Sequence, residues 1–244
     1  MASKLQNKKL YFLGLGASNI SAAKNLSQTN EIFVYDDKIS ELADFNFIHY
    51  NDIDFSSIDY LVATPAIPTT YPKSHPAIKL ALKHNVKIIG DIELYFMQFN
   101  RLPKIIAITG TNGKSTTTSL IYHLLSQTLS NKIYVGGNIG TSVFEIPIDE
   151  SAYYVIEMSS FQLELLSELE FDYSVLLNIT PDHLDRHKDL EGYVKAKMRI
   201  FYKKKLNNIA IICSDSPIAY NIFDSLENQK IKYNSDEIKE GDKG

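Results

Sequence analysis

Short apolar runs alternate along the chain with segments whose apolar residues recur at helical spacing. The runs predict buried strands, and the periodic segments predict helices. Predicted strands occupy residues 8–16, 31–37, 58–68, 86–90, 104–110, 153–158, 173–179 and 208–213. Predicted helices occupy residues 18–28, 75–84, 91–99, 114–129, 161–169 and 189–204, and the one at 91–99 is amphipathic. This alternation is typical of α/β proteins, in which helices connect the strands of parallel sheets.

The alternation is interrupted once, around residues 100–103, where a new strand begins after Pro103. Domains typically contain on the order of 100–200 residues, so a chain of this length holds one large or two modest domains. We therefore predict two domains, residues 1–100 and residues 101–244.

Composition excludes several classes of protein and leaves an ordinary globular one. The hydrophobic content of 44% and charged content of 22% are unexceptional, and a net charge of -4 argues against nucleic acid or an anionic membrane surface as partner. A single cysteine, Cys213, excludes an internal disulfide framework and indicates a reducing compartment. Neither a membrane-spanning run nor a signal peptide is visible, so we expect a cytoplasmic protein without membrane insertion.

A first glycine-rich turn follows the first predicted strand. Gly14 and Gly16 occupy the first two glycine positions of G-x-G-x-x-G, and Asp36 lies 20 residues after Gly16, where a ribose-binding carboxylate is expected. Asn19 stands at the third glycine position, which weakens the case for a nicotinamide dinucleotide. Two interpretations stay open, a nucleotide-binding turn and a tight strand-to-helix turn without a ligand.

A second glycine-rich turn, GTNGKST at residues 110–116, connects a predicted strand to a predicted helix. The standard phosphate loop has glycine where Ile108 stands, so this is a shorter form. Glycines still allow backbone N–H groups to approach phosphate oxygens, Lys114 adds a positive charge, and the Ser115 hydroxyl can bind magnesium. The alternative is an ordinary capped helix start. The residues predicted to bind ATP are Gly110, Thr111, Asn112, Gly113, Lys114, Ser115 and Thr116.

Acidic residues follow two later strands. Glu157 lies near the carboxyl end of a predicted buried strand, where open parallel sheets bind ligands and where a carboxylate can hold the magnesium of ATP. Asp182, His183 and Asp185 follow a second apolar strand. This cluster is either a metal site or a capped helix start.

Several motifs together resemble one known family, the Mur ligases, which add amino acids to the peptidoglycan precursor. The motifs are GTNGKST (110–116), GGNIG (136–140), EMSSFQLE (157–164), LNITPDHLDRH (177–187) and AKMRIF (196–201). Within the family, GLGAS (14–18), GDIELYF (90–96) and SSFQLE are most similar to the member that adds D-glutamate. Another Mur-type ligase or a folylpolyglutamate synthase, which shares GTNGKST, is the alternative among enzymes.

The resemblance implies an α/β architecture with a Rossmann-like, UDP-sugar-binding domain at 1–100. A partial ATP-binding central domain of the P-loop type is implied at 101–244. Two phosphate loops would then serve two nucleotides. Substrate-binding positions that match the family are Leu15, Gly16, Ala17, Ser18, Asp36, Asp37, Lys38, Thr64, Pro65, Asn138, Ser159 and Gln162. Ala66 replaces the glycine that the family usually has after the proline.

The reaction implied is ATP-dependent addition of D-glutamate to UDP-N-acetylmuramoyl-L-alanine through an acyl phosphate. Family similarity assigns catalytic roles to Lys114, Asn138, His183 and Lys197. It assigns two magnesium ions to Ser115, Glu157, His183 and Lys197, with Lys197 carbamylated. A carbamate would turn an ammonium, which repels a metal, into an anionic oxygen ligand.

The family's third domain has no counterpart in the 244 residues. We expect these residues to be a fragment or a truncated form, monomeric, and slow or inactive as a ligase when alone. The competing hypothesis is a binding module that keeps the UDP-sugar and ATP sites without catalysis.

Overall fold

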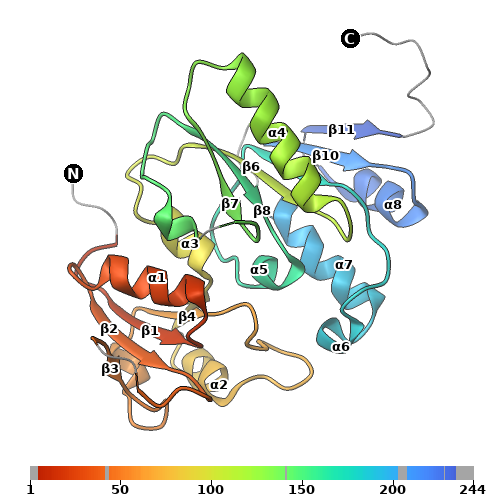
Figure 1. The fold of residues 1–244 in the computed structure, drawn as a ribbon. Coiled ribbons are helices and arrows are strands. Elements are labelled where there is room, and N and C mark those ends of the chain that lie inside the picture. The colour runs from red at the N-terminus through yellow and green to blue at the C-terminus, as the bar shows by residue number, and fades with distance from the viewer. Residues whose placement is uncertain (1–4, 42–43, 141, 203–207, 228, 235–244) are drawn as a thin grey trace.

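The computed structural model describes residues 5–41, 44–140, 142–202, 208–227 and 229–234. In this part of the chain the strands form two separate sheets, and every strand pair recorded in them is parallel. Figure 1 shows the two sheets at opposite ends of the molecule, with helices on their faces. The predicted α/β fold class is confirmed. None of the helices described is long and apolar enough to cross a lipid bilayer.

The first sheet has the order β3-β2-β1-β4-β5. Its strands are β1 (Lys9–Leu13), β2 (Glu31–Tyr35), β3 (Asn46–Phe47), β4 (Tyr60–Ala63) and β5 (Lys87–Ile89). Two α-helices cover it, α1 (Ala17–Leu26) and α2 (Pro76–Lys83), and a short 3-10 helix, η1 (Phe55–Ser57), precedes β4. Leu10 and Phe12 pack in one core cluster with α1, whereas Tyr11 and Leu13 pack in another with α2. Alternate residues of one strand therefore serve the two faces.

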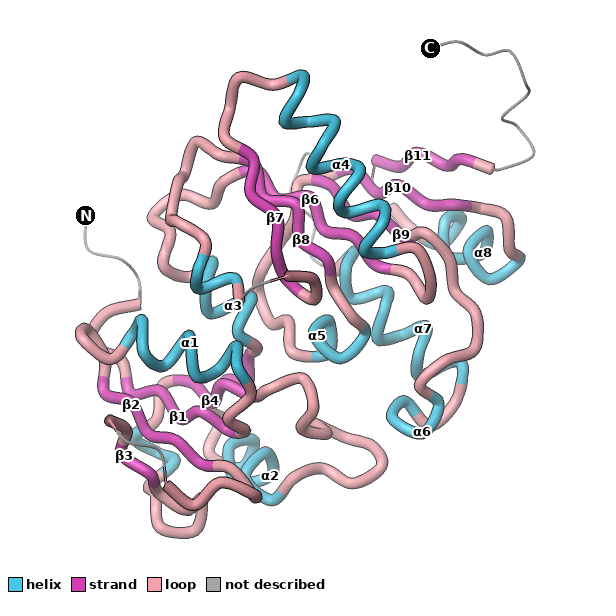
Figure 2. The backbone as a smooth tube through the Cα atoms, in the orientation of Figure 1, coloured by secondary structure: helices cyan, strands magenta, loops and turns pink. Residues whose placement is uncertain are grey.

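The second sheet has the order β11-β10-β9-β6-β8-β7. Its strands are β6 (Lys104–Thr109), β7 (Ile133–Gly137), β8 (Tyr153–Glu157), β9 (Tyr173–Leu176), β10 (Ile209–Cys213) and β11 (Gln229–Tyr233). Helix α4 (Lys114–Thr128) packs on one face. The other face carries α5 (Ser160–Glu164), α7 (Leu190–Met198) and α8 (Pro217–Ser225), as Figure 2 shows. The second half of the chain also contains three shorter helical turns, η2 (Val143–Glu145), α6 (Leu184–His187) and η3 (Arg199–Phe201).

Helix α3 (Asp91–Phe96) lies between the two sheets. The helix predicted at 91–99 is confirmed over Asp91–Phe96, three residues shorter than predicted, and its polar residues are buried together with its apolar ones. Tyr95 packs against Phe144 and Tyr154 of the second half of the chain. On the polar side, the Glu93 carboxylate accepts hydrogen bonds from the amides of Ser167 and Glu168. Burial of the polar side by a second domain leaves no signal in local periodicity.

Other element predictions need correction. The predicted helix at 161–169 ends at Glu164, and the one at 189–204 ends as an α-helix at Met198 before continuing as η3, with residues 203–204 outside the described part. The hydrophobic pattern does not predict β3, β7, α8 or β11. Strand β7 contains two glycines, and β11, QKIKY, is an exposed edge strand, so neither shows a run of apolar residues. The predicted division at residues 100–103 falls between β5 and β6 and stays a prediction.

Candidate active site

Both glycine-rich turns lie at topological switch points, where the order of successive strands in the sheet changes direction. Strand β1 pairs with β2 on one side and β4 on the other, and β6 pairs with β8 on one side and β9 on the other. In open parallel sheets, the crevice beyond the carboxyl ends of such strands is where ligands bind. The turns after β1 and β6 therefore occupy the two positions that the fold favours for ligands.

The turn after β6 leads directly into α4. Gly113, the residue before the helix, has φ +79°, a left-handed conformation that glycine adopts without strain. Lys114 donates hydrogen bonds to the carbonyls of Gly110 (3.0 Å) and Thr111 (2.9 Å), so the lysine lies folded over the loop. Ser115 and Thr116 are exposed in the first turn of α4. The predicted ATP-binding residues are contiguous around a helix N-terminus, as phosphate binding requires.

Asn178, which the sequence analysis did not single out, holds this loop in shape. Its Oδ1 accepts hydrogen bonds from the amides of Thr111 (3.0 Å) and Asn112 (2.9 Å), and its Nδ2 donates to the Asn112 carbonyl (3.0 Å). Because these two amides are occupied, the N–H groups of Gly113 and the first turn of α4 are the donors left for a phosphate. The sequence signal was the place of Asn178 in the motif LNITPDHLDRH (177–187), which did not indicate its role.

Lys197 of α7 lies beneath the same loop. Its side chain is 1% exposed, and its Nζ donates to the Gly110 carbonyl (2.8 Å) and the Thr109 hydroxyl (3.3 Å). The ammonium also lies 4.7 Å from the ring centroid of Tyr193. Burial, aided by repulsion from Lys114, lowers the pKa of Lys197 from 10.5 to about 7. The neutral amine of Lys197 is therefore accessible at neutral pH.

Glu157 ends β8 beside the loop and is 1% exposed. Its Oε1 accepts a hydrogen bond from the Asn138 side chain (2.7 Å), and the Asn138 amide donates to the Glu157 carbonyl (2.9 Å). Its Oε2 is buried and has no hydrogen-bond partner in the described part of the chain. A buried carboxylate oxygen without a donor fits a magnesium ion, which prefers oxygen ligands. The residues present are thus compatible with the predicted metal at Glu157.

His183 directly precedes α6 and has a left-handed backbone, φ +51°. Its Nε2 lies 3.5 Å from the Asp182 carboxylate, and its ring lies 4.9 Å from that of Phe161 and 6.3 Å from that of Tyr193, between centroids. The cluster therefore lies at a helix start, as one interpretation predicts, but no side-chain hydrogen bond caps the helix. No group of three or more His, Cys, Asp or Glu side chains arranged for a metal occurs in the described residues, so ligation by His183 stays a prediction.

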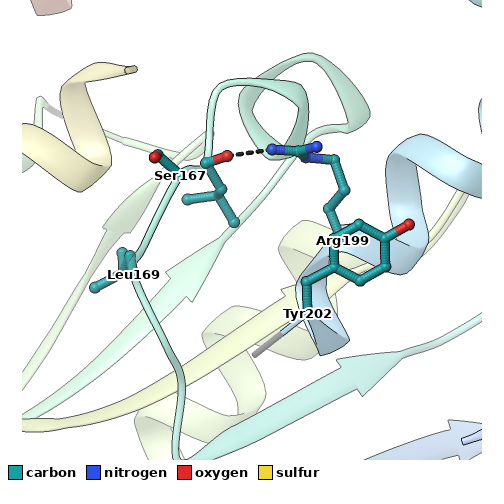
Figure 3. A pocket seen from close by; sticks show the side chains of 5 residues that line it. Ser167, Leu169, Arg199 and Tyr202 are labelled. Carbon is teal, nitrogen blue, oxygen red and sulfur yellow. Dashed lines mark hydrogen bonds between the residues drawn. The ribbon is translucent and has the colours of Figure 1, made fainter. Parts of the chain in front are cut away.

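The SSFQLE segment forms α5. Ser159 and Gln162 make a capping box, in which each side chain binds the other residue's backbone N–H group. Both side chains therefore have a structural role at the start of the helix, and their predicted contact with substrate remains untested. The far end of α5 is held by Arg199, whose Nε donates to the Leu163 carbonyl (2.8 Å) and whose guanidinium also reaches the Leu166 carbonyl (Figure 3).

The turn after β1 is held by polar side chains. The Leu15 amide donates to Asp36 (2.8 Å), and Asn19, at the missing glycine position, donates to the Gly14 carbonyl (2.9 Å). Gly16 is the N-cap of α1 and Ala17 is its first residue, and both residues are exposed at this helix N-terminus. Ser18 donates its hydroxyl proton to Asp91 of α3. That proton is not available to a phosphate while this bond persists.

The carboxylates after β2 divide their roles. Asp36 also accepts hydrogen bonds from the amides of Lys38 (2.8 Å) and Ile39 (3.1 Å). Burial alone would raise the pKa of Asp36, but its three backbone donors lower the pKa below its ordinary value. Asp37 is half exposed and lies 3.2 Å from His75. The side chain of Lys38 is exposed. Asp37 and Lys38 are therefore better placed than Asp36 to meet a ligand through their side chains.

Thr64 and Pro65 follow β4, directly across the crevice from the turn after β1. The Thr64 amide donates to the Leu13 carbonyl (2.9 Å), which fixes the two turns side by side. The structure therefore brings the turns that carry the predicted uridine-side residues together at the carboxyl ends of β1 and β4, and those of the ATP side together at the carboxyl ends of β6 and β8.

Comparisons with known proteins bear on the family and the fold of the chain. Residues 108–243 match the model of the Mur ligase middle domain. The UDP-N-acetylmuramoylalanine--D-glutamate ligase of Wolbachia pipientis wMel is 39% identical over 237 residues, covering 94% of this chain and 45% of the relative. The chain spans about half the length of the curated relatives that it matches.

Two solved structures share the fold. One is UDP-N-acetylmuramate:L-alanyl-gamma-D-glutamyl-meso-diaminopimelate ligase from Neisseria meningitides, with TM-score 0.57 and 13% identity, covering 93% of this chain and 78% of that one. The other is MurF ligase from Thermotoga maritima in complex with ADP, with TM-score 0.52 and 15% identity, covering 96% of this chain and 51% of that one. At these identities the likeness concerns the fold alone. With the family model matching more than half of the chain, the protein belongs to the Mur ligase family.

Proposed function

We propose that the natural protein catalyses ATP-dependent addition of D-glutamate to UDP-N-acetylmuramoyl-L-alanine, releasing ADP and phosphate. The observation that carries this proposal is the meeting of the α4 loop, Glu157 and the buried Lys197 at the carboxyl ends of β6 and β8. Curated relatives at about 40% identity are ligases of this substrate pair, which supports the choice within the family.

The chain's own residues divide the work in the proposed reaction. The first-turn amides of α4 and the Lys114 ammonium would hold the ATP phosphates and neutralise charge on the transferring group. The crevice between the turns after β1 and β4 would hold the uridine diphosphate. Asn138 would orient Glu157 as a metal ligand through the 2.7 Å hydrogen bond. Magnesium supplies Lewis-acid stabilisation when bound.

Lys197 is suited to carbamylation by its environment. The neutral amine attacks carbon dioxide, forms one N–C bond and loses one proton, so a depressed pKa favours the reaction at neutral pH. The product is an anion, which the nearby Lys114 would stabilise. Carbamylation and the second metal at His183 are part of the proposal, as are the monomeric state and the predicted substrate contacts.

Calorimetric titration of the folded chain tests the proposal. We expect saturable binding of UDP-N-acetylmuramoyl-L-alanine and of magnesium ATP, and no binding of NAD. Binding of NAD in place of the UDP-sugar would contradict the assignment of the first crevice. In the natural full-length protein, ADP release that depends on both D-glutamate and the UDP-sugar is the expected activity.

A lysine variant tests the carbamate. Lys197→Ala is expected to lose ligase activity and to regain part of it with added short carboxylic acids, which can place an oxygen anion in the space left by the side chain. Absence of rescue, with the variant still folded, would leave the carbamate without support.

A further inference from the structure

Arg186 of α6 connects the two domains from a buried position. Its side chain is 9% exposed, and its guanidinium donates to the carbonyls of Tyr71 (3.1 Å) and Ile67 (3.3 Å) in the first domain. We call residues 64–71, which begin with the predicted uridine-side Thr64, the strap. The same guanidinium lies 2.7 Å from the Glu164 carboxylate and 5.4 Å from the ring centroid of Phe161.

The Glu164 carboxylate extends this network into the second domain. Its other oxygen lies 3.1 Å from Nδ1 of His187, whose Nε2 lies 2.9 Å from the Ser160 hydroxyl. His187 is 5% exposed. Glu164 and Ser160 are the two ends of α5, so the network holds that helix at both ends while Arg186 reaches across to the strap.

We propose that Arg186 is a positioning residue that sets the spacing between the strap, α5 and α6. Each of these segments carries residues predicted to meet substrate or metal: Thr64 on the strap, Ser159 and Gln162 at α5, and His183 just before α6. Arg186 meets none of these ligands itself. The inference deepens the proposed function and rests on it.

The chemistry of the contacts favours arginine at this position. A planar guanidinium presents several donors in fixed directions, so one group can donate hydrogen bonds to two carbonyls while it forms an ion pair with a carboxylate. A lysine ammonium is a point charge and cannot reproduce that geometry. A buried ion pair adds less to stability than apolar packing does. The directional hydrogen bonds of the Arg186 guanidinium instead specify one arrangement of the segments that Arg186 joins.

The strap and the His183 turn belong to opposite halves of the predicted site, and the reacting carboxylate and phosphoryl groups would have to meet between them. Misplacement of a binding segment by about 1 Å can cost roughly a hundredfold in rate. Loss of Arg186 should therefore weaken the UDP-sugar and slow the chemical step, while the α4 loop, held by Asn178 instead, keeps its affinity for ATP.

The test uses the natural full-length protein with Arg186→Met and Arg186→Lys. For Arg186→Met we expect UDP-N-acetylmuramoyl-L-alanine affinity roughly tenfold weaker, kcat roughly a hundredfold lower, and ATP affinity within about twofold. Arg186→Lys, which keeps the charge beside Glu164, should recover part of the affinity. A folded Arg186→Met variant with unchanged UDP-sugar affinity and kcat would overturn the inference.

Lys104→Met is the matched control. It also removes a cation from a buried carboxylate, because Lys104 lies 2.8 Å from Asp172, which is 4% exposed, at the opposite end of β6 from the phosphate loop. This control should lower Tm without changing UDP-sugar affinity. An equal loss of affinity in the control would show a general loss of rigidity and contradict a specific role for Arg186.

Two further measurements keep the outcomes separate. If Arg186→Met does not fold, the double variant Arg186→Met/Glu164→Gln removes both charges together and takes its place. Amide hydrogen exchange of the strap needs no substrate and should become roughly tenfold faster in either variant, because the strap loses its two anchored carbonyls. Failure of the parent protein to bind the UDP-sugar would contradict the proposed function. An unchanged rate of amide hydrogen exchange in the strap would contradict the role of Arg186.

Discussion

Single residues at this site are defined by what surrounds them more than by their type. Lys195 and Lys197 are two positions apart on one helix, yet Lys195 is exposed beside Glu191 and Lys197 is buried under the phosphate loop. Burial lowers the pKa of Lys197 to about 7, whereas the Glu191 carboxylate raises the pKa of Lys195. The same side chain type is a solvated cation in one place and can lose its proton near neutral pH in the other.

This difference predicts a pH dependence of stability. Between about pH 7 and pH 10 the unfolded chain keeps the Lys197 proton and the folded chain does not, so the free energy of unfolding should rise with pH. Relative to Lys197→Met, which cannot titrate, the parent chain should gain at most about 1.4 kcal/mol per pH unit in this range. Urea unfolding in buffers free of carbon dioxide measures the difference, and a flat difference would contradict the buried amine.

A second prediction concerns Asn178. Replacing it with Ala removes the acceptor for the Thr111 and Asn112 amides and the donor to the Asn112 carbonyl. We expect ATP affinity to fall roughly tenfold, because the loop loses the bonds that preorganise it. Calorimetry measures the change, with Asn131→Ala, a change at an exposed asparagine that donates to Ser151, as control. Equal affinities in the two variants would contradict the role of Asn178.

At the scale of elements, the backbones of α6 and α7 lie in close contact just after His183. Helices α6 and α7 are joined by residues 188 and 189, and α7 begins so near the end of α6 that a Cβ on Gly192 would overlap the His187 carbonyl oxygen. The turn that precedes α6 also places His183 in a left-handed conformation. The sequence shows a glycine in a helix, which alone indicates only a weak helix.

Gly192→Ala should therefore be costly. The methyl group would push α6 from α7, and we expect the free energy of unfolding to fall by about 2–3 kcal/mol. Thermal or urea unfolding measures the loss. Glu191→Ala, at the exposed neighbouring position, should change stability by less than about 0.5 kcal/mol. A stable Gly192→Ala variant would show that the two helices can separate freely.

At the scale of the whole molecule, one core cluster runs through both halves of the chain. It contains Phe12 of β1, Tyr95 of α3 and Tyr154 of β8. Three residues of α3, Leu94, Tyr95 and Phe96, are at most 1% exposed. The helix assigned by sequence to the first domain is therefore buried by residues of both halves of the chain.

This shared core predicts that the first domain is incomplete by itself. A fragment of residues 1–100 would expose the aromatic face of α3, and we expect it to bind a hydrophobic dye and to lack a cooperative thermal transition. The whole chain should unfold in a single transition seen alike by tyrosine fluorescence and circular dichroism. A stably folded 1–100 fragment would instead support the boundary at residues 100–103 as a true domain boundary.

Sequence by itself determined the class of fold, the order of most strands and helices, and the two glycine turns with Lys114. These features depend on local periodicity and on residue types that have few alternative uses, so they are readable along the chain. It also named Lys197, but only through the register of a motif, because nothing local distinguishes a buried lysine from an exposed one.

Tertiary structure alone decided the roles of Asn178, Arg186 and Asp91. Each forms at least one hydrogen bond with a residue more than 60 positions away, and partners so far apart in the chain leave no periodic signal. Burial of the whole of α3 and of Lys197 was decided in the same way, since burial depends on which surfaces meet. The local pattern of apolar and polar residues therefore specified the helices and strands. Contacts between segments distant in the chain specified the chemical environment of the site residues.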